Sequence, residues 1–229
     1  MSVGAIVAAG GRGERLGSAT PKALVALGGE ALVVHACSAL RDAGVAEIVV
    51  AAPAESVDEV AALVRDARVV AGGATRTESV RRALAELSPD VDIVLVHDAA
   101  RALAPPSLVV RVVDAVSAGA DAVVPVLAVA DTIKQIDEAG AVVKTVDREM
   151  LRVVQTPQGF RRPVLVAAHQ AAGADADASD DAGLVERLGG RVVTVPGSAD
   201  ALKVTTQADL RTADMLLRHR QQGSGGLTS

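Results

Sequence analysis

The chain has 229 residues, of which 50% are hydrophobic, and this length and composition suit one α/β domain with a modest extension. It has no Trp or Tyr, a single Phe and a net charge of −5, which argues against nucleic acid and anionic membranes as partners. Its one cysteine, Cys37, allows no intrachain disulfide and no cysteine-cluster metal site. The apolar start, MSVGAIVAAGG, is too short to span a bilayer and lacks a basic signal segment, so we expect a cytoplasmic protein.

Short apolar runs alternate along the chain with segments of helical periodicity, which is the pattern of βαβ units around a mostly parallel sheet. The predicted strands are Val3–Ala8, Glu47–Ala52, Arg68–Ala71, Asp92–Val96, Ala122–Val126 and Val192–Val195. The predicted helices are Ala31–Ala43, Ser56–Asp66, Thr77–Leu87, Pro106–Ala118, Pro163–Ala172, Asp180–Leu188 and Gln207–Arg220. We therefore predict an α/β fold of the three-layer, Rossmann-like sandwich type.

One stretch departs from this alternation. Asp131–Ile136 and Val142–Val146 are strand-like and flank a turn sequence, DEAG, at residues 137–140. We predict a β-hairpin arm, about residues 131–156, inserted into a single domain of residues 1–220. A lone hairpin is marginally stable in water, so we expect the arm to pack on something such as a second subunit. The small, polar residues 221–229 are expected to form a disordered tail.

A glycine-rich segment, Ala8–Lys22, follows the first predicted strand directly. Glycines let a backbone approach an anion closely with its N–H groups, and α/β proteins bind ligands at this end of a parallel strand. The segment lacks the GxxxxGK[ST] string of a P-loop, and Gly17 falls one position too late for the dinucleotide fingerprint. Arg15 and Lys22 supply cations, so we interpret the loop as a grip for a nucleoside triphosphate.

Seven short motifs occur along the chain. They are AAGGRGERLGSATPK (8–22), GGATRTESV (72–80), VHDAAR (96–101), DTIK (131–134), TVDRE (145–149), QTPQGF (155–160) and ALKVT (201–205). Together they closely resemble the 2-C-methyl-D-erythritol 4-phosphate cytidylyltransferase family of the non-mevalonate isoprenoid pathway, over essentially the whole chain apart from the tail. The resemblance implies an enzyme that joins CTP to methylerythritol phosphate and releases pyrophosphate.

The resemblance assigns the nucleotide site. Arg15 and Lys22 match the positions that hold the triphosphate and stabilise charge at the α-phosphorus. Gly73 and Ser79 match positions that read the cytosine edge. Asp98 ends an apolar strand and is assigned to the nucleotide site, where it could orient a ribose or substrate hydroxyl or approach Mg²⁺. The backbone positions that would line the phosphates are Ala8, Ala9, Gly10 and Gly13.

The resemblance places part of the acceptor site on the hairpin arm. In the family this arm crosses to the partner subunit and completes its substrate site, so we expect a homodimer formed through the arm. Arg148 would bind and position methylerythritol phosphate, with Thr132 and Thr156 contacting the same substrate. Arg101 either joins them in binding substrate or simply pairs with Asp98.

The implied reaction is in-line attack of the substrate's phosphate oxygen on the α-phosphorus of CTP. That nucleophile is already anionic near pH 7, so no His or Cys base is required. Lys203 matches the family's lysine that helps place this phosphate. The repulsion between two polyanions would be offset by Arg15, Lys22, Arg148, Lys203 and Mg²⁺. Phosphate oxygens and water would hold most of the Mg²⁺ coordination, since the sequence shows no dedicated metal cage.

Three other functions fit part of the sequence. A nucleotidyltransferase acting on another acceptor, such as a sugar 1-phosphate, would use the same glycine loop, and the TVDRE and ALKVT motifs discriminate against it. An NAD(P)-dependent oxidoreductase needs a charged residue after the second strand, where Ala51-Ala52-Pro53 offers none. A non-catalytic regulator would bind nucleotide and release no pyrophosphate. Ala74 stands where the family usually has an acidic residue beside the cytosine, so the strictness for CTP stays open.

Overall fold

The computed structural model describes residues 1–11, 13, 16, 20–173 and 178–224, and its central element is an eight-stranded sheet. In its middle, β1 (Val3–Ala8) pairs in parallel with β4 (Glu47–Ala52) and with β6 (Ile93–Asp98), and β5 (Arg68–Ala71) extends the sheet beyond β4. These four strands confirm the predicted ones to within two residues. They are almost wholly apolar because helices cover both of their faces.

The other half of the sheet contains two antiparallel strands that the sequence analysis missed. β11 (Gln158–Arg161) runs antiparallel between β6 and β7 (Ala122–Ala128). β7 also pairs in parallel with β12 (Val192–Pro196) and antiparallel with β10 (Arg152–Val154). β11 carries Gly159, whose added Cβ would press against the helix packed on it, and its residues show neither alternation nor an apolar run. The sheet is therefore mostly parallel, as predicted, with two antiparallel insertions.

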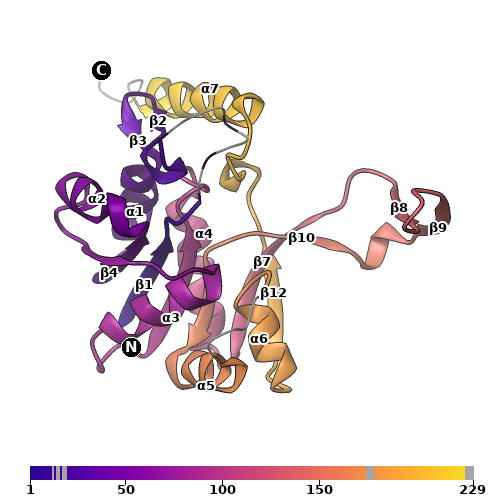
Figure 1. Ribbon diagram of the computed structural model, residues 1–229, viewed down its shortest axis with the longest axis horizontal. Coiled ribbons are helices and arrows are strands. Elements are labelled where there is room, and N and C mark those ends of the chain that lie inside the picture. The colour runs from indigo at the N-terminus through magenta and orange to yellow at the C-terminus, as the bar shows by residue number, and fades with distance from the viewer. Residues whose placement is uncertain (12, 14–15, 17–19, 174–177, 225–229) are drawn as a thin grey trace.

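Helices on both faces complete the three layers that the sequence predicts (Figure 1). One face is covered by α1 (Leu32–Asp42), α2 (Val57–Leu63) and α4 (Pro106–Ser117). The opposite face is covered by α3 (Arg76–Glu86), α5 (Arg162–Ala172) and α6 (Ala182–Arg187). Each group buries an apolar cluster against the sheet, and burial of that surface supplies most of the stabilising free energy.

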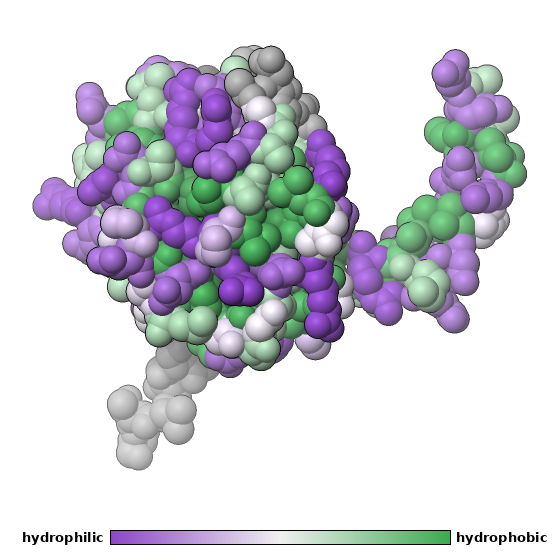
Figure 2. Space-filling model, turned by 90° about the horizontal axis from the view of Figure 1, so that it is seen from below, coloured by the Kyte–Doolittle hydropathy of each residue, from purple (hydrophilic) through white to green (hydrophobic). Residues whose placement is uncertain are grey.

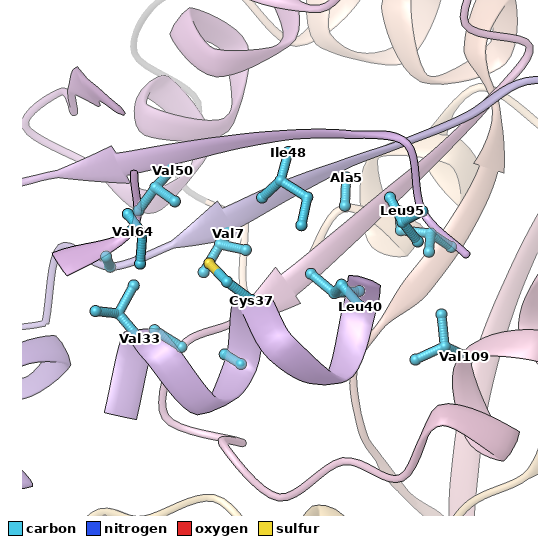
Figure 3. Close-up of a cluster of buried hydrophobic side chains, with 14 of the residues drawn as sticks. Ala5, Val7, Val33, Cys37, Leu40, Ile48, Val50, Val64, Leu95 and Val109 are labelled. Carbon is cyan, nitrogen blue, oxygen red and sulfur yellow. The ribbon is translucent and has the colours of Figure 1, made fainter. Parts of the chain in front are cut away.

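Cys37 packs within the first of these clusters. Figure 3 shows its sulfur beside α1 among aliphatic side chains that include Val7 of β1 and Leu40 of its own helix. Burial raises the pKa of the Cys37 thiol to about 11, so the thiolate is not populated near neutral pH. Cys37 is a packing residue and not a nucleophile.

The predicted arm extends away from the rest of the protein (Figure 1). It consists of β8 (Ile133–Ile136) and β9 (Val142–Val146), which pair antiparallel only with each other. Asp137 closes the predicted turn, because its carboxylate accepts hydrogen bonds from the N–H groups of Ala139 and Ala141. The arm is shorter at its C-terminal end than the predicted 131–156, since β10 and the buried residues 155–156 belong to the main sheet and its loop.

The C-terminal helix and a short hairpin lie at the carboxyl edge of the sheet (Figure 1). α7 (Gln207–Ser224) packs near the short hairpin of β2 (Ala26–Leu27) and β3 (Glu30–Ala31). α7 continues through residues 221–224, which we expected to be disordered, while residues 225–229 lie outside the described part of the chain. The short 3₁₀ helices are Lys22–Leu24, Ala54–Ser56, Arg148–Met150 and Ala199–Ala201. Within the described ranges, no helix is long and apolar enough to cross a membrane.

Candidate active site

A cavity of about 270 Å³ lies at the carboxyl ends of β1 and β6. Their last residues, Ala8 and Asp98, are paired neighbours in the sheet. The chain proceeds from β1 to β4 on one side and later to β6 on the other, so the strand order reverses here, as at the ligand sites of open α/β sheets. The cavity is lined by Ala8, Ala9, Gly10, Gly11, Lys22, Ala23, Gly73, Ala74, Thr75, Arg76, Ser79, Asp98, Ala99, Ala100 and Lys203.

The described part of the glycine-rich segment contributes residues 8–11 and Lys22 to one wall of this cavity. The N–H of Lys22 donates to the carbonyl of Gly11 over 2.9 Å, which brings the start of the 3₁₀ helix back against the loop. Gly13 has φ +73, a conformation that residues with a Cβ rarely adopt. A Cβ added at Gly10 would meet nothing within 4 Å, so this residue leaves the cavity open. Arg15 lies outside the described residues.

Asp98 is held between two cations inside the cavity. Its Oδ2 lies 2.7 Å from Nζ of Lys203, and its Oδ1 lies 3.5 Å from Nε of Arg76. Burial alone would raise the pKa of Asp98, but the two cations outweigh it and lower the pKa to about 2. Asp98 is therefore ionised at neutral pH, and it positions both cations at the cavity.

Arg76 continues this chain of charges into the core. Its Nη1 lies 2.5 Å from Oδ2 of Asp181, and Oδ1 of Asp181 lies 3.0 Å from Nε2 of His169. The Asp181 carboxylate is only 1% exposed, and its hydrogen bond with His169 and its pairing with Arg76 lower its pKa despite burial. Because Arg76 is anchored from behind, its guanidinium stays in place at the cavity wall.

Lys203 reaches the cavity from the loop that precedes α7. The N–H of Val204 donates to the carbonyl of Ala100 over 2.8 Å and docks this loop beside the end of β6. Lys203 is thus delivered to Asp98 by main-chain contacts.

Arg101 is held inside the protein, beside the loop that carries Lys203. It is 9% exposed and donates to the carbonyl of Ala201 over 2.7 Å and to that of Val154 over 3.1 Å. Burial lowers the pKa of Arg101, and no ion pair joins it to Asp98 among the described residues. Its guanidinium fixes the loop before Lys203, and it does not line the cavity.

Thr156 is likewise engaged inside the protein. It is 5% exposed, its hydroxyl accepts a hydrogen bond of 3.0 Å from the N–H of Asp98, and the same oxygen lies 3.0 Å from Nδ1 of His97. Burial lowers the pKa of His97 to about 4, so the ring is neutral near pH 7. Thr156 therefore fixes the end of β6 that carries Asp98.

Gly73 and Ser79 meet at the other wall of the cavity. The Ser79 hydroxyl accepts from the N–H of Gly73 over 3.0 Å and donates to the carbonyl of Thr75 over 2.8 Å. Thr75 is the N-cap of α3, and its side chain accepts from the N–H of Glu78. The first turn of α3 thereby holds the loop that faces the glycine-rich segment across the cavity.

The two arm residues lie apart from the cavity of their own chain. Thr132 and Arg148 are exposed, and neither is among the residues that line it. Arg148 donates to the carbonyl of Ala130. The Asp147 carboxylate accepts from the N–H of Glu149 and caps a 3₁₀ turn.

Comparison with known proteins decides the family. A sequence model of the 2-C-methyl-D-erythritol 4-phosphate cytidylyltransferase family matches residues 3–219. A protein of that name from Saccharopolyspora erythraea is 59% identical over 225 residues, which are 95% of this chain and 100% of the relative. Another from Frankia casuarinae is 56% identical over 217 residues, or 94% and 81% of the two chains. The crystal structure of the Thermus thermophilus protein of the same name has a TM-score of 0.81 and 40% identity, with 95% and 100% coverage. The chain belongs to this cytidylyltransferase family.

Family membership confirms the resemblance on which the site residues were chosen. In the structure, Lys22, Asp98 and Lys203 all line one cavity. It also adds Arg76, which lies in the GGATRTESV motif and received no role from the sequence. Its partner Asp181 lies 105 residues away, and no local pattern indicates that contact.

The cavity of this cytidylyltransferase offers little to a metal ion by itself. In the described ranges, no group of three or more His, Cys, Asp or Glu residues could hold one. Among the described residues that line it, Asp98 is the one carboxylate, and each of its oxygens already faces a cation. This donor set fits a cation whose coordination comes mainly from a ligand's own oxygens.

Proposed function

We propose that this protein joins CTP and 2-C-methyl-D-erythritol 4-phosphate to give 4-diphosphocytidyl-2-C-methyl-D-erythritol and pyrophosphate, a step of isoprenoid precursor biosynthesis. One observation carries the proposal beyond family membership. Lys22, Arg76 and Lys203 converge on a single cavity at the strand-order reversal, with Asp98 between two of them. Such a cluster of cations suits a polyanionic nucleotide and a phosphorylated acceptor.

The cluster can stabilise the charge that develops when an acceptor phosphate oxygen attacks the α-phosphorus in line. Lys22 and Arg15 on the glycine-rich loop would hold the triphosphate, and the N–H groups of Gly10 and Gly13 would lie along it. Lys203 would exchange its contact with Asp98 for the incoming phosphates. Since the phosphate nucleophile is anionic near pH 7, the neutral His97 needs no part in proton transfer.

Magnesium would accompany the triphosphate and supply further neutralisation of its charge. Among the described lining residues Asp98 is the one carboxylate, and Mg²⁺ in such sites keeps water and phosphate ligands. Asp98 is the residue that could contact its coordination shell or the ribose. The cytosine would lie toward Gly73 and Ser79, and the phosphates would lie along Ala8 and Ala9.

We propose that the acceptor site is completed by the arm of a second copy of the chain. The arm exposes four large apolar side chains along its length (Figure 2). They are Ile136, Val142, Val143 and Met150, which are 58% to 84% exposed. Arg148 and Thr132 sit on this arm and away from their own cavity, so a partner's cavity is where they would meet substrate. Arg101 and Thr156 would support the acceptor site indirectly, through Lys203 and Asp98.

Pyrophosphate release tests the activity. The purified protein with Mg²⁺ is expected to release pyrophosphate from CTP only when methylerythritol phosphate is present. A sugar 1-phosphate in place of the acceptor serves as the matched control. Pyrophosphate release with the sugar 1-phosphate but not with methylerythritol phosphate would show that the proposed acceptor is wrong. CTP binding without pyrophosphate release on either acceptor would indicate a nucleotide-binding regulator.

Mixing two inactive variants tests the shared site. Lys22→Ala disables one cavity and Arg148→Ala disables one arm, so a heterodimer of the two retains one intact pair of cavity and arm. We expect partial recovery of activity after subunit exchange. Heterodimers demonstrated by mass spectrometry that show no recovery would contradict the shared site.

A further inference from the structure

In the loop at residues 72–75, on the wall of the cavity, side chains accept hydrogen bonds from the N–H groups of Gly73 and Ala74. The N–H of Gly73 donates to the Ser79 hydroxyl over 3.0 Å, and the N–H of Ala74 donates to Oε2 of Glu78 over 2.7 Å. Among the described residues, none donates a hydrogen bond to the carbonyl oxygen of either loop residue. As long as these two hydrogen bonds are kept, the main-chain groups that Gly73 and Ala74 offer to a ligand are their carbonyl oxygens, which only accept.

Further contacts fix the Glu78 side chain where its carboxylate accepts the hydrogen bond from the N–H of Ala74. Its own N–H is capped by the Thr75 hydroxyl over 3.1 Å, and its second carboxylate oxygen pairs with Arg82. Arg82 also donates to the carbonyl of Gly72 over 2.8 Å, so the ion pair is tied to the loop at two points. A Cβ added at Gly73 would overlap the Glu78 carboxylate, which shows how closely that side chain crosses the loop.

A loop that offers hydrogen-bond acceptors and no donors discriminates between cytosine and uracil. Cytosine carries an amino group at C4, which donates hydrogen bonds, whereas uracil carries a carbonyl oxygen there, which accepts them. A loop that offers carbonyl oxygens binds the amino group and leaves the uracil oxygen unpaired. If Glu78 were absent, the freed N–H of Ala74 would become a donor that suits uracil.

We propose that Glu78 is a specificity-determining residue, which makes the nucleotide site selective for cytidine over uridine nucleotides by occupying the Ala74 N–H. The role is that of a positioning residue, since Glu78 acts on the loop and does not itself line the cavity. The proposal rests on the proposed use of a cytidine nucleotide and names the residue that enforces it.

Three variants separate this role from a general effect on the helix. Glu78→Ala frees the Ala74 N–H and removes the ion pair with Arg82. Glu78→Gln removes the same ion pair but keeps an oxygen that accepts from Ala74. Glu86→Ala removes a different exposed ion pair of α3, with Arg68 at 3.0 Å, and serves as the matched control.

The measured quantity is the ratio of kcat/KM for CTP to that for UTP, with methylerythritol phosphate as acceptor. We expect Glu78→Ala to lower this ratio about tenfold, the scale of one hydrogen bond exchanged for a mismatch. The change should reside in KM, with kcat for CTP retained. Glu78→Gln and Glu86→Ala should keep the wild-type ratio. An unchanged ratio in Glu78→Ala, or an equal fall in Glu78→Gln, overturns the proposal.

Two further measurements keep the outcome decisive. Titration calorimetry of CTP and UTP needs no acceptor, so the ratio of their Kd values tests Glu78 even if the wild-type protein uses a different acceptor. Wild-type inactivity with methylerythritol phosphate would count against the proposed function alone. If thermal unfolding shows that Glu78→Ala is not folded, Glu78→Asp, whose shorter side chain withdraws the carboxylate from Ala74, is expected to lower the ratio in its place.

Discussion

His97 makes the stability of the protein depend on pH in a way that can be calculated. The side chain is fully buried in β6, and its Nδ1 faces the hydroxyl of Thr156 at 3.0 Å. Burial lowers its pKa from 6.5 to about 4, although the neighbouring carboxylate of Asp98 opposes the shift. The unfolded chain therefore takes up a proton near pH 6.5, whereas the folded protein does so only near pH 4.

The sign and size of the effect follow from this difference. Between pH 6.5 and pH 4 the unfolded state binds one proton more, so the free energy of unfolding falls as the pH falls. The shift of about 2.5 pKa units, at about 1.4 kcal/mol per unit, corresponds to roughly 3 kcal/mol. The contribution of His97 is fully present above pH 6.5 and is lost by about pH 4.

Urea denaturation at several pH values measures this contribution. His97→Asn keeps an acceptor for the Thr156 hydroxyl but cannot be protonated, so its stability should fall less than that of the wild type between pH 7 and pH 4. The difference should be roughly 3 kcal/mol. His219→Asn, at an exposed position on α7, is the control and should follow the wild type. Parallel curves for the wild type and His97→Asn would refute the reasoning.

Further changes test the site itself. Lys22→Ala should lower kcat roughly a hundred- to a thousandfold with an unchanged melting temperature, and near wild-type turnover would remove Lys22 from the mechanism. Gly73→Ala should displace Glu78 from the loop and raise the KM for CTP in steady-state assays, and an unchanged KM would contradict that contact. Arg76→Ala leaves Asp181 buried without its cation and should reduce the free energy of unfolding by about 3–5 kcal/mol. Adding Asp181→Asn should restore part of that loss in denaturant titrations, and strictly additive losses would count against the ion pair.

Periodicity predicts most of the fold because most elements bury one continuous face. The parallel strands and the seven helices carry either apolar runs or helical spacing, and their predicted positions are close to those observed. β10 and β11 lack both signals. β10 is exposed along its whole length, and β11 contains a glycine that close packing of α4 requires. Their pairing depends on what lies beside them in space, which no local pattern contains.

The candidate site likewise contains residues that local patterns predict and residues that only the fold brings together. Lys22 and Asp98 were selected from local signals, a glycine-rich loop and the end of an apolar strand, and both line the cavity. Arg76 was missed because its importance comes from a distant carboxylate. The hydrogen bonds that Arg101 and Thr156 make within the protein join segments about 50 to 100 residues apart, so no local pattern indicates them.

The way in which the arm joins the sheet has a consequence for how such a protein can change. Ala128, the last residue of β7, is paired with Arg152, the first of β10, so the arm departs and returns at adjacent points. β7 can pair with β10 whatever the number of residues in the arm between them, and lengthening a surface loop costs little entropy. The arm is thus a module that evolution or an engineer can lengthen, shorten or exchange, while the nucleotide cavity at the ends of β1 and β6 keeps its geometry.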